Sequence, residues 1–148
     1  MRTLLSALLL ATAIGCGNSR PPAEPNDDEP QPKRVSVGQE FTLRRGERAA
    51  VGDGVLLVTF LAVASDSRCA ADVVCVWQGD AELTFRIESP LSEAPFMGID
   101  TLHTGIEPRS ATRFGYTVKL ERVQPYPYSN DEPGARDYRA TLIVSGGN

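Results

Sequence analysis

Two cysteines, Cys69 and Cys75, are the side chains of this sequence whose type and spacing most directly indicate chemistry. If the pair is oxidised, it closes a seven-residue loop, for which chain entropy predicts roughly 2.4 kcal/mol of stabilisation. A thioredoxin-like redox pair has two residues between its cysteines and lies in a βαβ unit, and this pair has neither feature. We therefore predict a structural disulfide between Cys69 and Cys75.

The only tryptophan follows this pair closely. Trp77 lies two residues after Cys75, so in an extended strand both side chains would point to the same face. A large ring packed on the bridge would hold the core together at this corner, which we favour over a surface role in sugar stacking. We expect Trp77 and Gly79 to belong to the structural core.

The other reactive side chains match no catalytic or metal-binding pattern. Zinc needs about four ligands, and besides the cysteine pair the chain offers one histidine, His103, which we interpret as a surface residue. There is no G-x-S-x-G elbow, and no spacing selects a pair of carboxylates. Four acidic residues lie around the cysteine pair and could in principle hold calcium, but their spacing is not that of an EF-hand: Asp66, Asp72, Asp80 and Glu82. We therefore interpret them as a solvated acidic rim, with Arg68 as an ion-pair partner. We predict no catalytic residue, no metal and no cofactor.

Residues 1–15 have the features of a secretory signal peptide, with a basic start and an apolar run too short to span a bilayer. The sequence that ends at Cys16 resembles the bacterial lipobox, whose cysteine is diacylated, although Ala13 stands where that pattern has leucine. An ordinary cleavage site after Gly15 is the alternative, but it would leave Cys16 as an unpaired thiol in an oxidising compartment. We expect Cys16 to carry the lipid that attaches the protein to a membrane.

Residues 16–34 read as a tether. This segment is rich in proline and acidic residues and has no large apolar residue, so it cannot bury enough surface to fold. Its prolines favour extended polyproline II, with a reach of up to roughly 55 Å. The residues after Cys16 lack the aspartate that retains some lipoproteins in the inner membrane, so the resemblance implies the outer membrane of the cell envelope.

Residues 35–148 are predicted to form one all-β domain, because their hydrophobic period is two and no helix of useful length is indicated. We expect an antiparallel sandwich or barrel of about seven to eight short strands, with one near-continuous apolar strand at 55–64 covered on both sides. In the strand at 83–88, Leu83, Phe85 and Ile87 should point inward. Val123 lies out of phase in the strand at 115–123, which indicates a bulge or the strand end. The other predicted strands are 39–43, 48–51, 101–104 and 138–144.

The charge balance excludes one class of partner. The chain has 15 basic and 19 acidic residues, a formal net charge of −4, and loses Arg2 with the signal peptide. An acidic domain has no electrostatic footprint for nucleic acid. It also gains little from anionic lipid headgroups, so acyl chains must supply the membrane attachment.

Two tyrosines on a proline-rich loop, Tyr126 and Tyr128, are candidates for contact with a partner. Aromatic residues on a stiff loop lose little entropy on binding and are enriched in interface hot spots. The alternative is that one or both rings fold back over a sheet edge.

The run D-S-R-C at 66–69, followed by C-V-W-Q-G-D-A at 75–81, resembles a family of bacterial exported and lipoprotein domains with a D-S-R-C-P and C-x-W-x-G-x-A motif. In that family a Tyr-x-Val-x-Leu strand, a Pro-Tyr-Pro segment and a final Tyr-x-Ala strand often follow, as they do here from Tyr116, Pro125 and Tyr138. The one departure in the motif is Ala70, where the family has proline. The resemblance implies the fold and the export of the chain but no activity.

These observations favour a non-enzymatic, membrane-attached binding or structural domain whose partner is an envelope protein or a glycan. A more specific alternative is an inhibitor of an envelope-directed hydrolase, either a lysozyme or a protease. A hydrolase that uses carboxylates ranks lower. A deep pocket with two facing carboxyl groups would favour the enzyme, and a shallow aromatic loop would favour binding.

Overall fold

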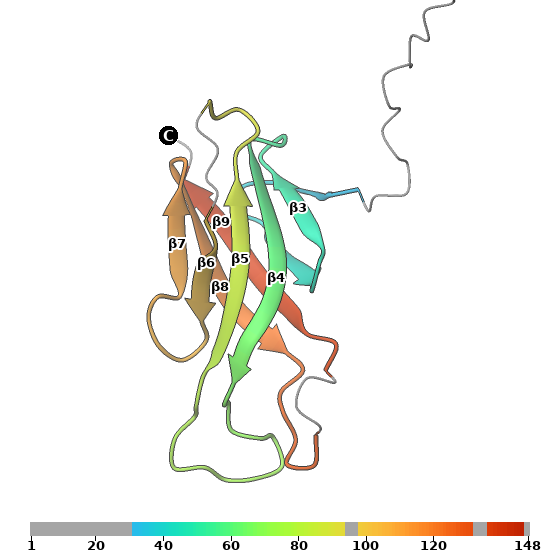
Figure 1. Cartoon of the computed structure of the whole chain (residues 1–148), viewed down its shortest axis with the longest axis vertical. Helices are drawn as coiled ribbons and strands as arrows, with labels where there is room; N and C mark the ends of the chain where they lie inside the picture. Colours follow the sequence, from blue (N-terminus) through green and yellow to red (C-terminus); the bar gives the residue numbers. More distant parts are fainter. Residues whose placement is uncertain (1–30, 94–97, 132–135, 147–148) are drawn as a thin grey trace, which may run out of the picture.

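The computed structural model describes residues 31–93, 98–131 and 136–146, which form nine β-strands and no helix. The strands are β1 (Lys33–Val35), β2 (Glu40–Arg44), β3 (Arg48–Val51), β4 (Leu56–Asp66), β5 (Ala81–Glu88), β6 (Asp100–His103), β7 (Ser110–Arg113), β8 (Tyr116–Gln124) and β9 (Arg139–Gly146). One sheet has the order β1-β3-β4-β5-β6 and the other the order β2-β9-β8-β7. Figure 1 shows the two sheets as stacked layers. The predicted all-β class is confirmed, and the architecture is a sandwich.

The core lies between the two sheets and is filled by alternate side chains of the strands. In β5, Leu83, Phe85 and Ile87 are fully buried, as the period of two predicted. Phe60 of β4 stacks on Phe85, with 5.2 Å between the ring centroids. Leu142 of β9, in the other sheet, is also fully buried in this core. Long-range packing of these alternating faces is what holds the sandwich together.

The strand β8 contains the predicted irregularity. Its register with β9 shifts between Leu120 and Arg122, which identifies a bulge within the strand and not its end. Because one residue is added at this point, Val123 returns to the buried face. The bulge therefore explains why Val123 is out of phase in the sequence.

Three details differ from the sequence prediction. Lys33 and Arg34 of β1 were assigned to the tether, but β1 pairs in parallel with β3 and so belongs to the sandwich. β7 was not predicted, because its four residues include no large apolar side chain. The strand β4 is central in its sheet, but Leu57 and Leu61 on its outer face are only partly buried, so β4 is not covered on both sides.

Two connections meet at one end of the sandwich, at the bottom of Figure 1. Residues 67–80 join β4 to β5, and we call them the disulfide loop; residues 125–131 follow β8, and we call them the tyrosine loop. The strand β1 lies toward the opposite end, because Val35 pairs with Val51, which in turn pairs with Leu56 at the start of β4.

Candidate functional site

Cys69 and Cys75 form the predicted disulfide bond within the disulfide loop. Their Cα atoms are 5.9 Å apart, a usual separation for bonded cysteines. Main-chain hydrogen bonds close the neck of the loop: the N–H of Ser67 donates to the Asp80 carbonyl at 2.7 Å, and the N–H of Cys69 donates to the Gln78 carbonyl at 2.8 Å. The sulfur bridge and these bonds together restrict the loop's conformation.

Gly79 has a structural role at this neck and not in the hydrophobic core. Its φ angle is +68°, a left-handed conformation that favours glycine. A Cβ atom at position 79 would lie only 1.9 Å from the carbonyl oxygen of Ser67. Glycine is therefore required here both by the backbone angle and by the close approach of the two chain segments.

The prediction that Trp77 belongs to the core is wrong, because this residue is 83% exposed. The prediction assumed an extended strand that runs from Cys75 through Trp77. The strand β5 begins only at Ala81, and residues 67–80 form no strand, so side-chain alternation does not apply to them. The ring consequently lies on the surface of the loop.

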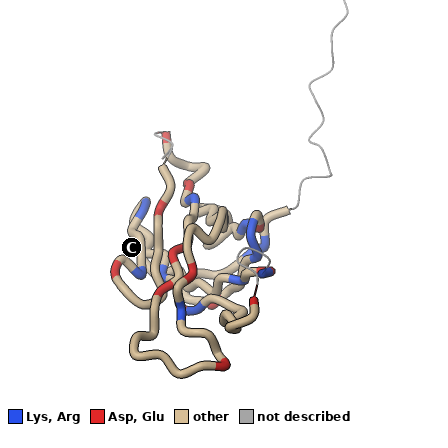
Figure 2. The backbone as a smooth tube through the Cα atoms, turned by 60° about the horizontal axis from the view of Figure 1, so that its bottom comes forward, with Lys and Arg blue, Asp and Glu red and all other residues tan. Residues whose placement is uncertain are grey.

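Four exposed apolar residues occupy the disulfide loop, and we call them the apolar loop surface: Val73, Val74, Val76 and Trp77. Figure 2, which brings this end of the molecule forward, shows the loop as a projecting and largely uncharged stretch. The valines were not predicted as site residues. The sequence did contain a signal for them: a run of apolar residues lies in and next to the seven-residue disulfide loop. A loop of that size is too short to turn these side chains back into the core. Grouped apolar side chains on a surface often mark an interaction site.

Behind the disulfide loop, Arg68 and Asp66 form a buried ion pair in which each side chain is only 4% exposed. Nε of Arg68 donates to one carboxylate oxygen of Asp66 and Nη2 donates to the other, both at 2.8 Å. Arg68 also donates to the carbonyls of Val123 at 2.7 Å and Pro125 at 2.8 Å. Arg68 is thus an ion-pair partner, as expected, but Asp66 is buried and not part of a solvated rim.

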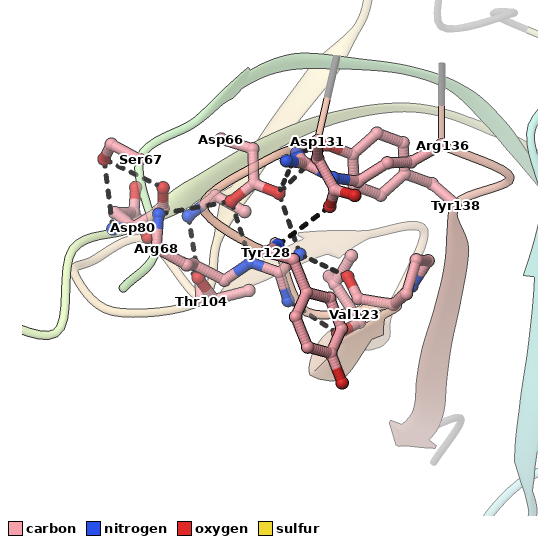
Figure 3. Close-up of polar contacts among 12 residues, drawn as sticks. Asp66, Ser67, Arg68, Asp80, Thr104, Val123, Tyr128, Asp131, Arg136 and Tyr138 are labelled. Carbon is pink, nitrogen blue, oxygen red and sulfur yellow. Dashed lines mark hydrogen bonds and ion pairs between the residues drawn. The ribbon is translucent and has the colours of Figure 1, made fainter. Parts of the chain in front are cut away.

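The same network continues into the tyrosine loop, as Figure 3 shows. The hydroxyl of Tyr138 donates to Asp66 Oδ2 at 2.9 Å, and Nη1 of Arg136 donates to the Tyr138 hydroxyl at 2.9 Å. Nε of Arg136 donates to Asp131 Oδ2 at 2.8 Å, and that oxygen also accepts the N–H of Tyr128 at 2.8 Å. A chain of polar contacts therefore connects the end of β4 to the tyrosine loop.

The charge state of Asp66 follows from these contacts. Burial by itself raises the pKa of Asp66, whereas the hydrogen bonds and charge of Arg68 and the hydroxyl of Tyr138 lower it. The lowering contacts prevail, so the pKa of Asp66 lies below its ordinary value. The carboxylate remains charged at neutral pH and compensates the buried guanidinium.

Direct contacts also join the two loops. The N–H of Ala71 donates to the Pro127 carbonyl at 2.8 Å. The carboxylate of Asp72 accepts the N–H of Ser129 at 2.9 Å and its hydroxyl at 2.5 Å, and these bonds lower the pKa of Asp72. These hydrogen bonds consequently hold the disulfide loop and the tyrosine loop in fixed positions relative to each other.

Tyr126 and Tyr128 are 57% and 53% exposed. The ring of Tyr126 lies 4.7 Å from the guanidinium carbon of Arg68, a cation–π contact. Tyr126 thus contacts the buried network and still presents much of its surface to solvent. Both tyrosines lie on the loop that is hydrogen-bonded to the disulfide loop.

His103 differs from the isolated surface histidine that we expected. Its side chain is 16% exposed, and Nδ1 lies 2.6 Å from Asp80 Oδ2. The other oxygen of Asp80 accepts the N–H groups of Thr104 at 2.9 Å and Gly105 at 2.7 Å. Burial raises the pKa of Asp80, but the bonds from Gly105 and His103 lower it below its usual value. The pair links the end of β6 to the neck of the disulfide loop.

Two clefts on the described part of the molecule have volumes of several hundred Å³. One of about 340 Å³ lies beside the disulfide loop, and its only carboxylate is that of Glu121. The other, of about 690 Å³, lies beside β1 and has one carboxylate, that of Asp53. Neither cleft places two carboxylates opposite each other.

Within residues 31–93, 98–131 and 136–146, no three acidic, histidine or cysteine side chains gather as ligands for a metal ion. The same residues include no helix with the length and apolarity needed to cross a membrane. Comparisons of the chain with protein-family models, with curated proteins and with solved structures found no match.

Proposed function

We propose that this protein is a lipid-anchored domain of the bacterial cell envelope that binds a protein partner through the apolar loop surface and catalyses no reaction. The observation that carries the proposal is the exposure of Trp77 and three valines on a loop that is braced by a disulfide and hydrogen bonds. Cys16, the proposed site of the lipid, lies outside the described residues, and the lipobox resemblance supports its role.

The energetics of binding favour such a loop. Interface hot spots are enriched in tryptophan, tyrosine and arginine, and a tryptophan flanked by apolar residues buries a large area when it enters a pocket. A loop that is already ordered loses less conformational entropy on binding than a mobile one. The bonds from Ala71 and Asp72 to the tyrosine loop supply this order and hold the exposed Tyr126 and Tyr128 on a loop joined to the disulfide loop.

A protein partner suits this surface better than a glycan does. Recognition of a sugar requires several polar groups around an aromatic ring, because the hydroxyls of the ligand need hydrogen-bond partners. The other large apolar side chains exposed on the disulfide loop are three valines, which offer only apolar contact. The apolar centre of a protein interface has this composition.

The position of the surface agrees with attachment at the N-terminus. The strand β1, where the described chain enters the sandwich, lies toward the end opposite the disulfide loop (Figure 1). An anchor that precedes β1 would therefore be attached at the end of the domain opposite the apolar loop surface, so attachment leaves that surface free for a partner. We propose the outer membrane as the location.

Inhibition of an envelope-directed hydrolase, such as a lysozyme or a protease, is the second candidate. The observation that favours it is the convex, covalently closed loop, a shape that complements the concave cleft of an enzyme. A hydrolase that uses carboxylates ranks below it, because each of the two clefts has a single carboxylate.

Partner binding can be tested by photo-crosslinking in envelope extract, with a photo-crosslinker placed on this protein beside the disulfide loop. We expect one specific adduct, lost in Trp77→Ser and weakened in Tyr126→Ala/Tyr128→Ala. Leu91→Ser is the matched control, because Leu91 is 75% exposed but follows the opposite end of β5. An adduct that persists in Trp77→Ser would refute the proposal. Lysozyme and protease assays with the purified domain then separate inhibition from simple binding.

A further inference from the structure

The smaller cleft lies between the disulfide loop, the segment after β6 and the end of β8. Its volume of about 340 Å³ is in the range of small-ligand sites, which is roughly 300–1,000 Å³. Its wall includes the ring of Tyr126 and the apolar residue Val123, and its charged residues are three arginines and one glutamate. Val74 and Trp77 do not line it, so the cleft is distinct from the apolar loop surface.

Arg109 differs from the other charged residues of the cleft. Its Nε is buried and has no hydrogen-bond acceptor among the described residues. Glu107 accepts the main-chain N–H of Arg109 at 2.8 Å, but no described carboxylate pairs with the guanidinium itself. Buried donors in proteins normally have an acceptor, but Arg109 is the one charged residue of the cleft whose guanidinium has neither a hydrogen-bond acceptor nor an ion-pair partner among the described residues.

The remaining charges that line the cleft are balanced by neighbours. Three ion pairs account for them: Arg68 with Asp66 at 2.8 Å, Arg122 with Glu40 at 3.2 Å, and Glu121 with Lys119 at 2.9 Å. The cleft is therefore left with one uncompensated positive charge, that of Arg109. An arginine of this kind binds a carboxylate through parallel N–H donors.

We propose that this cleft binds a monocarboxylate, with the carboxylate on Arg109 and an apolar part against Tyr126. A single negative charge matches the single uncompensated guanidinium. A dianion such as phosphate is disfavoured, because its second negative charge would find no further uncompensated cation among the residues that line the cleft. The ligand is a free small carboxylate or the C-terminus of a peptide, since both offer the same group.

The experiment is an NMR titration of the ¹⁵N-labelled full chain with N-acetylphenylalanine. The matched probes are N-acetylphenylalanine amide, which lacks the charge, a short peptide that ends in free phenylalanine, and inorganic phosphate. We expect saturable shifts of the Arg109 Nε–H and of the amides of Gln78, Thr104 and Gly105 with the free acid, and binding at least tenfold weaker with the amide and with phosphate. A peptide that binds at least tenfold more tightly than the single residue would identify a C-terminus as the source; equal affinity would identify a small acid.

Arg109→Gln should weaken binding of the acid at least tenfold without unfolding the chain, because the side chain makes no described hydrogen bond. Arg45→Gln is the control, since Arg45 is exposed and does not line the cleft, and it should bind as the natural chain does. Trp77→Ser should also retain binding, which separates this site from the proposed partner surface. Equal shifts with acid and amide, equal binding of phosphate, or unchanged binding in Arg109→Gln would overturn the proposal.

Discussion

The hydroxyl of Tyr138 lies 2.9 Å from Asp66 Oδ2, although 72 residues separate the two along the chain. The contact joins the start of β9 to the end of β4, and these strands belong to different sheets. Because Asp66 also holds Arg68, and Arg68 binds the carbonyls of Val123 and Pro125, one carboxylate supports both loops at this end.

Asp66→Asn should lower the free energy of unfolding by about 3–5 kcal/mol, the usual effect of removing one partner of a buried ion pair. The loss arises because the guanidinium of Arg68 is left buried without a compensating charge. Urea denaturation at pH 7 measures it. Asp137→Asn is the control, because Asp137 is exposed and its surface pair with Arg139 should contribute about 0–1 kcal/mol. Equal losses in the two variants would contradict the role of Asp66.

Acid should remove the contribution of Asp66. The folded-state pKa lies below the ordinary value of 3.8, so the unfolded chain takes up a proton at a higher pH than the native chain. The stabilisation is therefore complete above the unfolded value and declines as the pH falls through the folded one. In urea unfolding from pH 7 to pH 2, the difference in free energy of unfolding between the natural chain and Asp66→Asn should narrow below about pH 4. A difference that stays constant with pH would contradict the coupling between folding and protonation of Asp66.

Gly79→Ala should destabilise the protein more than Gly46→Ala does. Both glycines have left-handed φ angles, +68° and +85°, but a Cβ at position 46 meets nothing within 4 Å. Gly46→Ala should therefore cost only the conformational penalty of about 1–2 kcal/mol. Gly79→Ala must in addition displace the backbone at Ser67. Thermal or urea unfolding of the two variants gives the difference, and a similar loss in both would argue against the close approach.

The variant Cys69→Ala/Cys75→Ala should lose roughly 2.4 kcal/mol, the chain-entropy value for a loop of this size. Treatment of the natural chain with a reductant should cause a similar loss and should leave the double variant unchanged. Mass spectrometry of the unreduced protein should find the peptides of Cys69 and Cys75 linked. Detection of two free thiols in exported protein would refute the bridge.

Cys16→Ser should move the protein from the membrane fraction to the soluble fraction of the envelope, because the acyl chains are the predicted attachment. Fractionation followed by immunoblotting measures the change. Cys69→Ala/Cys75→Ala is the control, since it also removes thiols but keeps Cys16, and it should stay with the membrane. If Cys16→Ser remains in the membrane fraction, the lipoprotein prediction is wrong.

Much of the fold was predictable from the sequence, because strand pairing in a sandwich buries one face of each strand. The alternation of Leu83, Phe85 and Ile87 and the phase change at Val123 each appear in the structure as predicted. The strands β1 and β7 were missed, since each is short and carries little apolar signal. Their pairing with β3 and β8 depends on neighbours that sequence periodicity does not identify.

For the site, the sequence by itself determined the close cysteine pair and the tyrosines on a proline-rich loop. The tertiary structure decided that Trp77 is exposed, that Asp80 holds His103, and that Asp66 is buried under Tyr138. The physical reason is that period-two alternation describes residues only while they lie in a strand. After Asp66 the chain leaves β4, and the surroundings of each side chain are then set by loops that are distant in sequence and meet only in the folded protein.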